Sequence, residues 1–343
     1  MFDYSVDVPV MILFFNRPST LEKVYEAVKA ARPSILLLAQ DGARKGNPTD
    51  AERVEECRRI VENIDWDCTV YKNYSEANLS CDPREFSAID WAFTLVDRLI
   101  ILEDDCVPVP SFFPFCAELL ERYKDDDRVD RICGLNRIEK YDDIESDYFF
   151  STIASGHGWA TWKRTWESIK RLVDYSFLDD KDLVDVYNHS RDIIVDRNYG
   201  DIIAQSRELK AENQASGMIT SWENLVGINS LINSSLIITP KRNMIKNIGA
   251  TIDATHYSEL KYCDPVVRRI LLMDSYDVEF PLKHPSHIIR DIRYEKRHYK
   301  KIHVSPLKRI FFKLGIGFRR LFSGDFKGLK KAIGRRFKKN GSK

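Results

Sequence analysis

A short apolar run that ends in three carboxylates, Leu99 to Asp105, constrains the fold of this chain more than any other stretch. Its first four residues are all aliphatic, which is typical of a strand buried on both faces of a parallel sheet. The acids follow at the carboxyl end of that strand, and open α/β sheets bind ligands in the crevice beyond this edge. We therefore expect Glu103, Asp104 and Asp105 to line a binding site.

Adjacent carboxylates repel one another unless a cation or water screens them. Hard oxygen ligands suit Mg²⁺ or Mn²⁺, so the acids predict a site for one of these ions, facing a phosphate ligand. The alternative is an acidic turn that merely ends the strand. A second acidic triplet, 125–127, follows a charged, helix-like stretch and precedes Arg128. We interpret this second triplet as the solvated end of a helix.

Strands and helices are predicted to alternate along most of the chain, which indicates an α/β fold with a mostly parallel sheet flanked by helices. The segment 172–215 is charged, free of proline and predicted to be a helical insertion. The expected strands are 8–15, 34–39, 69–71, 99–102, 131–134, 148–153 and 236–239, and the expected helices are 19–31, capped by Ser19 or Thr20, 49–63, 83–97 and 112–123.

Charge is distributed unevenly along the 343 residues. Residues 305–343 carry 13 Lys and Arg against one acid, which leaves 40 basic and 51 acidic residues before them. Seven cysteines in no spaced pattern argue against a disulfide framework and indicate a reducing compartment. The N-terminal stretch has no basic region before its short apolar run, so neither a signal peptide nor a membrane span is predicted there.

Six motifs in order resemble the bacterial nucleotide-diphospho-sugar glycosyltransferases of the GT-A fold, in the group related to glycosyltransferase family 2. Around the acidic motif the chain is also similar to the N-acetylglucosaminyltransferase that initiates complex N-glycans. The resemblance covers about residues 8–257. The motifs are FFNRP at 14–18, QDG at 40–42, IILEDD at 100–105, GWATW at 158–162, Trp222-Glu223, and the stretch from NIG to DATH at 247–256.

The resemblance implies a GT-A catalytic domain over 1–260, a connecting segment over 261–304 and a separate tail over 305–343. It implies that Asn16, Arg17 and Asp41 hold the nucleotide base and ribose. The alternative for Asp41 is that it only shapes its Asp-Gly turn.

The acidic motif would bind the metal, with Asp105 as the direct ligand, Asp104 near the ribose or a metal-bound water, and Glu103 in the same motif. His256 would approach the metal or diphosphate, and Trp159 would line the sugar or acceptor side. The alternatives are a loop histidine for His256 and core aromatics for the tryptophans at 159, 162 and 166, the last two being favoured as core.

Transfer from a nucleotide sugar breaks the bond between the anomeric carbon and a diphosphate, and a divalent cation offsets the negative charge on the leaving group. The attacking hydroxyl must lose its proton, so an inverting enzyme needs a carboxylate on the opposite face of the donor. Glu223, expected in a loop, is the candidate base; the alternatives are a surface glutamate or a ligand of an acceptor hydroxyl. Two departures from the family pattern are Ser80, where relatives often have glycine, and Glu223, where they have aspartate.

The tail alternates Phe, Leu and Ile with Lys and Arg at helical spacing, which predicts a basic amphipathic helix on an anionic membrane surface. It could instead dock on the acidic body or stay partly disordered; nucleic acid is disfavoured because no base-stacking module is present.

These features predict a cytoplasmic, peripheral membrane glycosyltransferase that moves a sugar, UDP-sugar favoured, to a glycan or lipid-linked glycan in surface polysaccharide synthesis. The alternatives are a sugar nucleotidyltransferase, disfavoured for want of a glycine-rich phosphate loop after the first strand, and a non-catalytic nucleotide-, glycan- or membrane-binding protein.

Overall fold

The structure is a computed structural model that describes residues 7–190, 197–249 and 265–302. His256 and the basic tail, for which a site and a membrane role are predicted, lie outside the described residues. In the part of the chain that is described, no helix is both long and apolar enough to span a bilayer.

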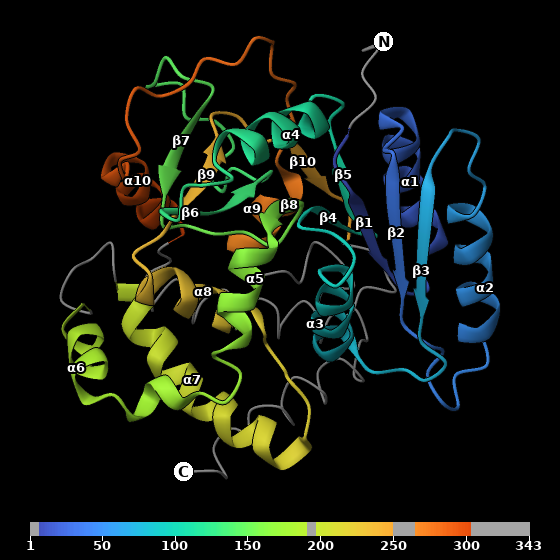
Figure 1. Ribbon diagram of the computed structural model, residues 1–343, viewed down its shortest axis with the longest axis horizontal. Helices are drawn as coiled ribbons and strands as arrows, with labels where there is room; N and C mark the ends of the chain where they lie inside the picture. The colour runs from blue at the N-terminus through green and yellow to red at the C-terminus, as the bar shows by residue number, and fades with distance from the viewer. Residues whose placement is uncertain (1–6, 191–196, 250–264, 303–343) are drawn as a thin grey trace, which may run out of the picture.

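An eight-stranded sheet forms the centre of the molecule, in the order β3-β2-β1-β4-β8-β6-β9-β7 (Figure 1). Only β8 and β7 run against the other strands, because β8 pairs antiparallel with β4 and β6, and β7 pairs antiparallel with β9. The strands are β1 (Val10–Phe14), β2 (Ile35–Gln40), β3 (Thr69–Tyr74), β4 (Arg98–Glu103), β6 (Val129–Cys133), β7 (Tyr148–Ser151), β8 (Trp159–Trp162) and β9 (Leu236–Pro240). The predicted α/β class, with a mostly parallel sheet flanked by helices, is confirmed.

Side chains of β1 alternate between two hydrophobic cores, one on each face of the sheet, as the pleat of a strand requires. Val10 and Ile12 face a core shared with α1 (Pro18–Ala31), α2 (Asp50–Val61) and α4 (Phe112–Arg122). Met11 and Leu13 face the other core, shared with α3 (Cys81–Ala92), α5 (Lys163–Lys170) and α8 (Glu223–Ile232). Both faces are covered, which explains why β1 has an uninterrupted apolar sequence.

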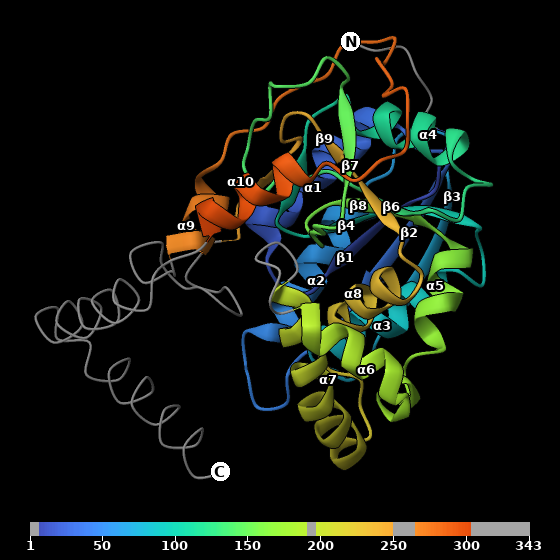
Figure 2. The ribbon, with the colours of Figure 1, turned by 90° about the vertical axis from the view of Figure 1, so that its left-hand side faces the viewer.

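The predicted helical insertion contains the short helix η1 (Ser176–Asp179) and two longer helices, α6 (Lys181–Ser190) and α7 (Arg197–Ser216). Figure 2 shows α6 and α7 beside α8, on the far side of that helix from the sheet. A second small sheet joins β5 (Cys106–Pro108) to β10 (Ile245–Asn247) in antiparallel pairing. Two helices follow in the connecting segment, α9 (Pro265–Leu272) and α10 (Ile292–Ile302).

Two local predictions are corrected by the structure, and one strand is found that was not predicted. The helix after β1 begins at Pro18 with Arg17 at its N-cap, so neither Ser19 nor Thr20 caps it, because proline with its fixed φ takes the first position. Residues 159–162 form a strand that pairs with β4, not only a cluster of aromatics. Glu223 is the first residue of α8, not part of a loop.

Candidate functional site

The acidic motif lies where the direction of chain progression across the sheet reverses. From β1 the chain moves outward through β2 to β3, and it then returns to β4 on the opposite side of β1. Leu13 of β1 is in register with Glu103 of β4, so the loops after both strands leave the sheet at the same level. A crevice forms at such a reversal point, and ligands of open α/β sheets bind there.

Arg17 bridges the loop after β1 to the acids after β4. Its guanidinium donates to Asp104 and, at 2.9 Å, to Asp105 Oδ2. The backbone N–H of Phe15 also donates to Asp104 Oδ2 at 3.2 Å. Burial lowers the pKa of Arg17, but the charges of Asp104 and Asp105 outweigh this effect and raise it overall. Arg17, which is predicted to bind the nucleotide, therefore supplies the positive charge between the carboxylates of Asp104 and Asp105.

Asp105 is enclosed from its other side by the segment after β10. The Asn247 amide donates to Asp105 Oδ1 at 3.2 Å, and the N–H of Ile248 donates to the Asp105 carbonyl at 2.8 Å. A Cβ on Gly249 would overlap Asp105 Oδ2. The Asn-Ile-Gly motif is thus a close-fitting support for Asp105, and only glycine fits at its third position.

Glu103 lies among other carboxylates that come from distant parts of the chain. Burial raises its pKa well above the ordinary value, and the charges of Glu85, Asp105, Asp104 and Glu223 raise it further. Burial also raises the pKa of Asp104 to about 6, although Arg17 opposes the shift. Glu85 of α3 and Glu223 of α8 are therefore near enough to act on the acids at the end of β4, and we call Glu85, Glu103, Asp104, Asp105 and Glu223 the carboxylate cluster.

Two carboxylates of α3 fix the turn that precedes Glu223. The backbone N–H of Ser221 donates to Asp82 Oδ2 at 2.8 Å, and the indole N–H of Trp222 donates to Glu85 Oε2 at 3.0 Å. Glu223 itself is exposed to solvent. Partial desolvation by its surroundings raises the pKa of Glu223, and the charge of Asp82 adds to that. Glu223 is therefore a base that a ligand in solution can reach.

The residues after β4 fit a divalent cation. Ligand atoms of Glu103, Asp105 and Cys106 lie within 4.8 Å of one another. The pKa of Cys106 is raised well above its ordinary value, first by burial and then by the charges of Asp105 and Glu103, so its thiol stays protonated. The carboxylate oxygens are the donors that Mg²⁺ or Mn²⁺ prefers. Among the described residues, Glu103 has no basic partner that would neutralise it.

Asn16 and Asp41 lie at the same edge of the sheet, where their polar atoms hold the loops. Asn16 donates to Asp50 Oδ1 at 2.8 Å. Asp41 accepts hydrogen bonds from the backbone N–H groups of Gly42 and Leu79, both at 2.9 Å, and from the Asn78 amide at 2.8 Å. Burial raises the pKa of Asp41. Asp41 thus shapes its turn, as the alternative predicts, and its contact with a nucleotide stays a prediction.

Trp159 belongs to the hydrophobic core that contains Met11 and Leu13. Its side chain is 3% exposed, and its ring stacks on that of Trp222 with the centroids 6.1 Å apart. The ring is therefore mostly covered by protein, and its contact with a sugar or acceptor stays a prediction. Trp162 and Trp166 are buried core residues, as predicted.

Sequence reasoning missed Asp82, Glu85 and His157 as members of the site. The first two lie three residues apart on α3, which places both on one face of the helix. That spacing was the available signal, but nothing in the sequence shows that this face turns toward β4. Burial lowers the pKa of His157, while Asp105 raises it and Arg137 lowers it, so this histidine lies between the acids and a basic region.

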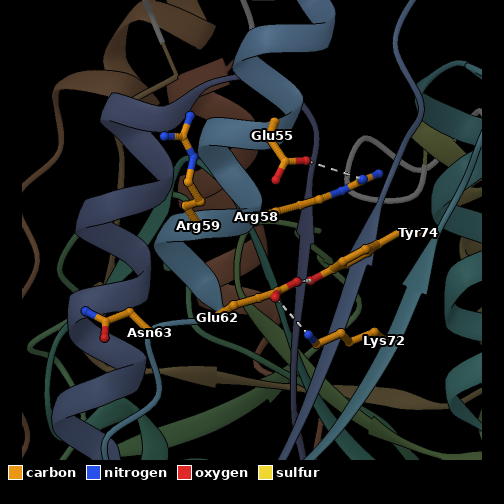
Figure 3. A pocket seen from close by; sticks show the side chains of 7 residues that line it. All are labelled: Glu55, Arg58, Arg59, Glu62, Asn63, Lys72 and Tyr74. Carbon is orange, nitrogen blue, oxygen red and sulfur yellow. Dashed lines mark hydrogen bonds and ion pairs between the residues drawn. The ribbon is translucent and has the colours of Figure 1, made fainter.

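A hollow of about 560 Å³ lies apart from the carboxylate cluster, between α2 and the edge strand β3 (Figure 3). Some of its charged groups pair with one another: Lys72 Nζ is 2.8 Å from Glu62 Oε2, and Tyr74 donates to Glu62 Oε1 at 2.9 Å. The full lining is Glu55, Arg58, Arg59, Glu62, Asn63, Lys72 and Tyr74. These contacts neutralise Glu62, which lies in the centre of the lining between Lys72 and Tyr74.

No protein-family model matches the sequence, and no curated protein matches it either. Similar solved structures include a cytidylyltransferase from Leptospira borgpetersenii (13% identity, TM-score 0.30, 49% of this chain), a UDP-glucose pyrophosphorylase complexed with UDP-glucose (10%, 0.29, 48%) and a 4-diphosphocytidyl-2C-methyl-D-erythritol synthase from Anaerococcus prevotii (7%, 0.30, 52%). The matches span 65%, 80% and 79% of those three chains, so less than two thirds of the cytidylyltransferase is matched. Likeness at this level carries no argument about function, which therefore rests on the site.

Proposed function

We propose that this chain is a metal-dependent glycosyltransferase of the GT-A type, which moves a sugar from a nucleoside-diphosphate donor to a hydroxyl group of a glycan or lipid-linked glycan. The observation that most supports this proposal is that Glu223, at the start of α8, lies near enough to the acids at the end of β4 for its charge to raise the pKa of Glu103. The acids supply a site for the donor diphosphate, and Glu223 supplies a base for the acceptor.

The chain's own residues account for donor binding in this proposal. Glu103 and Asp105 would hold Mn²⁺ or Mg²⁺, which offsets charge on the departing diphosphate when bound. Arg17 would move from Asp105 toward a phosphate oxygen as the cation takes its place between the carboxylates. Asn16 and Asp41 lie at the same edge and would contact the nucleoside. UDP is the favoured nucleotide.

Glu223 would act on the acceptor. Its carboxylate takes the proton of the attacking hydroxyl group, whose oxygen bonds to the anomeric carbon as the bond to the diphosphate oxygen breaks. The raised pKa of Glu223 makes it a stronger base near neutral pH than an ordinary glutamate. Attack from the face opposite the leaving group inverts the anomeric configuration, so we propose an inverting enzyme.

Arg17 supports a second candidate, a sugar nucleotidyltransferase. In that reaction a phosphate oxygen of a sugar phosphate attacks the α-phosphorus of a nucleoside triphosphate, and pyrophosphate leaves. A guanidinium directly after the first strand is placed to neutralise that leaving group. The attacking phosphate carries no proton to remove, so this reaction gives the exposed carboxylate of Glu223 no role. We favour sugar transfer for that reason.

Product analysis separates the two candidates. Purified protein with Mn²⁺ is given UDP-sugars or GDP-sugars with an acceptor extract, and in parallel UTP or CTP with sugar 1-phosphates. Release of free nucleoside diphosphate that stops on EDTA addition supports sugar transfer. Formation of pyrophosphate supports nucleotidyl transfer and contradicts our proposal. Nucleotide binding without either product would indicate a non-catalytic binding protein.

The basic segment 305–343 lies outside the described residues, and we propose that it binds an anionic membrane surface. Truncation after His303 should abolish sedimentation with phosphatidylserine vesicles and leave metal-dependent donor hydrolysis unchanged. Continued sedimentation of the truncated chain would contradict the membrane role.

A further inference from the structure

Three basic side chains from separate elements lie close to one another. Arg137 is in the loop that follows β6, Arg269 is on α9 and His298 is on α10. Arg269 Nη2 donates to the Arg137 carbonyl at 2.9 Å, and Leu135 packs with Ile270 of α9. Figure 2 shows α9 beside α10. We call these three residues the basic cluster.

Three nitrogen atoms of the basic cluster form no hydrogen bond. Arg137 Nε, Arg269 Nε and His298 Nε2 are buried and have no hydrogen-bond partner. Arg137 Nη1 donates only to the Ala154 carbonyl, at 3.2 Å. Among the described residues, neither arginine forms an ion pair. Burial lowers the pKa of both arginines, and the charge of Arg137 lowers that of Arg269 further.

Such an arrangement is costly without an anion. Arg137 and Arg269 are partly buried, but buried nitrogen atoms in folded proteins nearly always have partners, so three unpartnered ones in one place are unusual. Elsewhere in this chain buried arginines are satisfied: Arg131 Nε lies 3.0 Å from Asp130 Oδ1, and Arg84 donates to the Gln40 carbonyl at 3.1 Å. The contrast indicates that the basic cluster is completed by a ligand.

The chemistry of the cluster favours phosphate. Two guanidinium groups match the charge of a phosphate dianion and can each donate two parallel hydrogen bonds. Burial and the two arginine charges lower the pKa of His298 to about 3, so its imidazole is neutral and can donate an N–H without adding positive charge. A carboxylate would match only one of the two charges.

The basic cluster is close to the acidic motif but distinct from it. The charge of Asp105 raises the pKa of His157, and the charge of Arg137 lowers it, so His157 is near both groups. Its Nδ1 is 3.1 Å from Ser155 Oγ. Helix α9 also packs against β10, whose Asn247 contacts Asp105. A single ligand region can therefore reach both groups of side chains.

We propose that Arg137, Arg269 and His298 bind a phosphate group of the acceptor, separate from the donor diphosphate that the acidic motif binds with its cation. Assigning the phosphate to the acceptor rests on the proposed function, whereas the phosphate site itself does not. A sugar acceptor linked through phosphate to its carrier has the required chemistry.

Calorimetric titration of the full chain with inorganic phosphate tests the site, using wild type, Arg137→Gln, Arg269→Gln and the double variant. Arg128→Gln is the matched control, because Arg128 is exposed and paired with Asp126. We expect each single variant to raise the phosphate Kd at least tenfold, the double variant to show no binding, and the control to match wild type. Unchanged phosphate binding by the double variant, or none by wild type, would overturn the proposal.

A second titration, of UDP with Mn²⁺, separates the two substrates. We expect Arg137→Gln and Arg269→Gln to bind UDP as wild type does, and bound UDP to leave phosphate binding intact. Loss of UDP binding in both variants would mean that the basic cluster holds the donor diphosphate, which overturns the assignment to the acceptor. If wild type binds phosphate but no nucleotide, the proposed function fails and the phosphate site stands. Arg269→Lys, which keeps the charge, checks that any loss does not come from misfolding of α9.

Discussion

The chain contains two acidic triplets, and they differ in almost every physical property. Asp104 is buried after a central strand, and burial raises its pKa to about 6. Asp126 follows a surface helix, and its hydrogen bond with Arg128 lowers its pKa. The pKa of an aspartate is therefore raised by burial in one triplet and lowered by an arginine partner in the other. Clustered carboxylates indicate a ligand where the fold removes them from water, because burial then opposes their charge.

Substitution of one aspartate in each triplet should give the largest difference between the two triplets. Asp105→Asn removes a charge from the predicted metal site and keeps the hydrogen bond from Asn247, so we expect nucleotide turnover to fall by about 10²–10³-fold or more and Mn²⁺-dependent UDP binding to disappear. The matched control, Asp125→Asn, should change neither. Steady-state kinetics and calorimetry measure both effects. Wild-type binding by Asp105→Asn would show that the buried triplet holds no metal.

Glu223→Gln tests whether the cluster includes a base. The amide cannot accept the proton of an acceptor hydroxyl group, so kcat should fall by about 10²–10⁴-fold while donor KM stays near its wild-type value. Glu167→Gln on α5 is the control, because Glu167 is a surface helical glutamate paired with Lys170. A change in KM alone would indicate that Glu223 binds the acceptor instead.

The sequence predicted one half of the site better than the other, for a physical reason. The strands that lead to Arg17, Asp41 and Glu103 are continuous apolar runs, and parallel strands deliver their carboxyl ends to one edge. The sequence therefore predicts that Arg17, Asp41 and Glu103 lie at the same edge of the sheet. Glu85 and Arg137 have no such marker, because their role depends on how α3 turns about its axis and on how α9 packs against the loop after β6.

Long-range packing also explains the errors near Glu223. Its segment lacks a strong helix-start signal: Ser221 adopts a positive φ of 49°, and Trp222 forms no side-chain cap. The hydrogen bonds from Ser221 and Trp222 to Asp82 and Glu85 fix the start of α8. Those partners lie more than a hundred residues away in the sequence, so local pattern could not reveal the helix boundary.

The pH dependence of the free energy of unfolding should also differ between the carboxylate cluster and the surface triplet, by a few kcal/mol at most. Burial raises the pKa of Glu85 from 4.5 to about 7, and Glu223 adds to the shift. The folded state therefore holds this proton more tightly than the unfolded state, and stability is lost as the pH rises from about 4.5 to about 7. Glu85→Gln should remove this loss, gaining ~1–3 kcal/mol over wild type at pH 8 relative to pH 4.5.

Asp126→Asn should show the opposite sign in the same urea titrations. The lowered pKa of Asp126 contributes stability above its unfolded value of 3.8, which is lost as the pH falls below that value. Because Asp126 and Arg128 are on the surface, the variant should lose no more than ~0.5 kcal/mol at pH 7. Matching pH slopes for Glu85→Gln and Asp126→Asn would contradict the assignment of the Glu85 cluster to a desolvated site. Opposite slopes would show that desolvation, and not the number of acids, distinguishes the carboxylate cluster from the surface triplet.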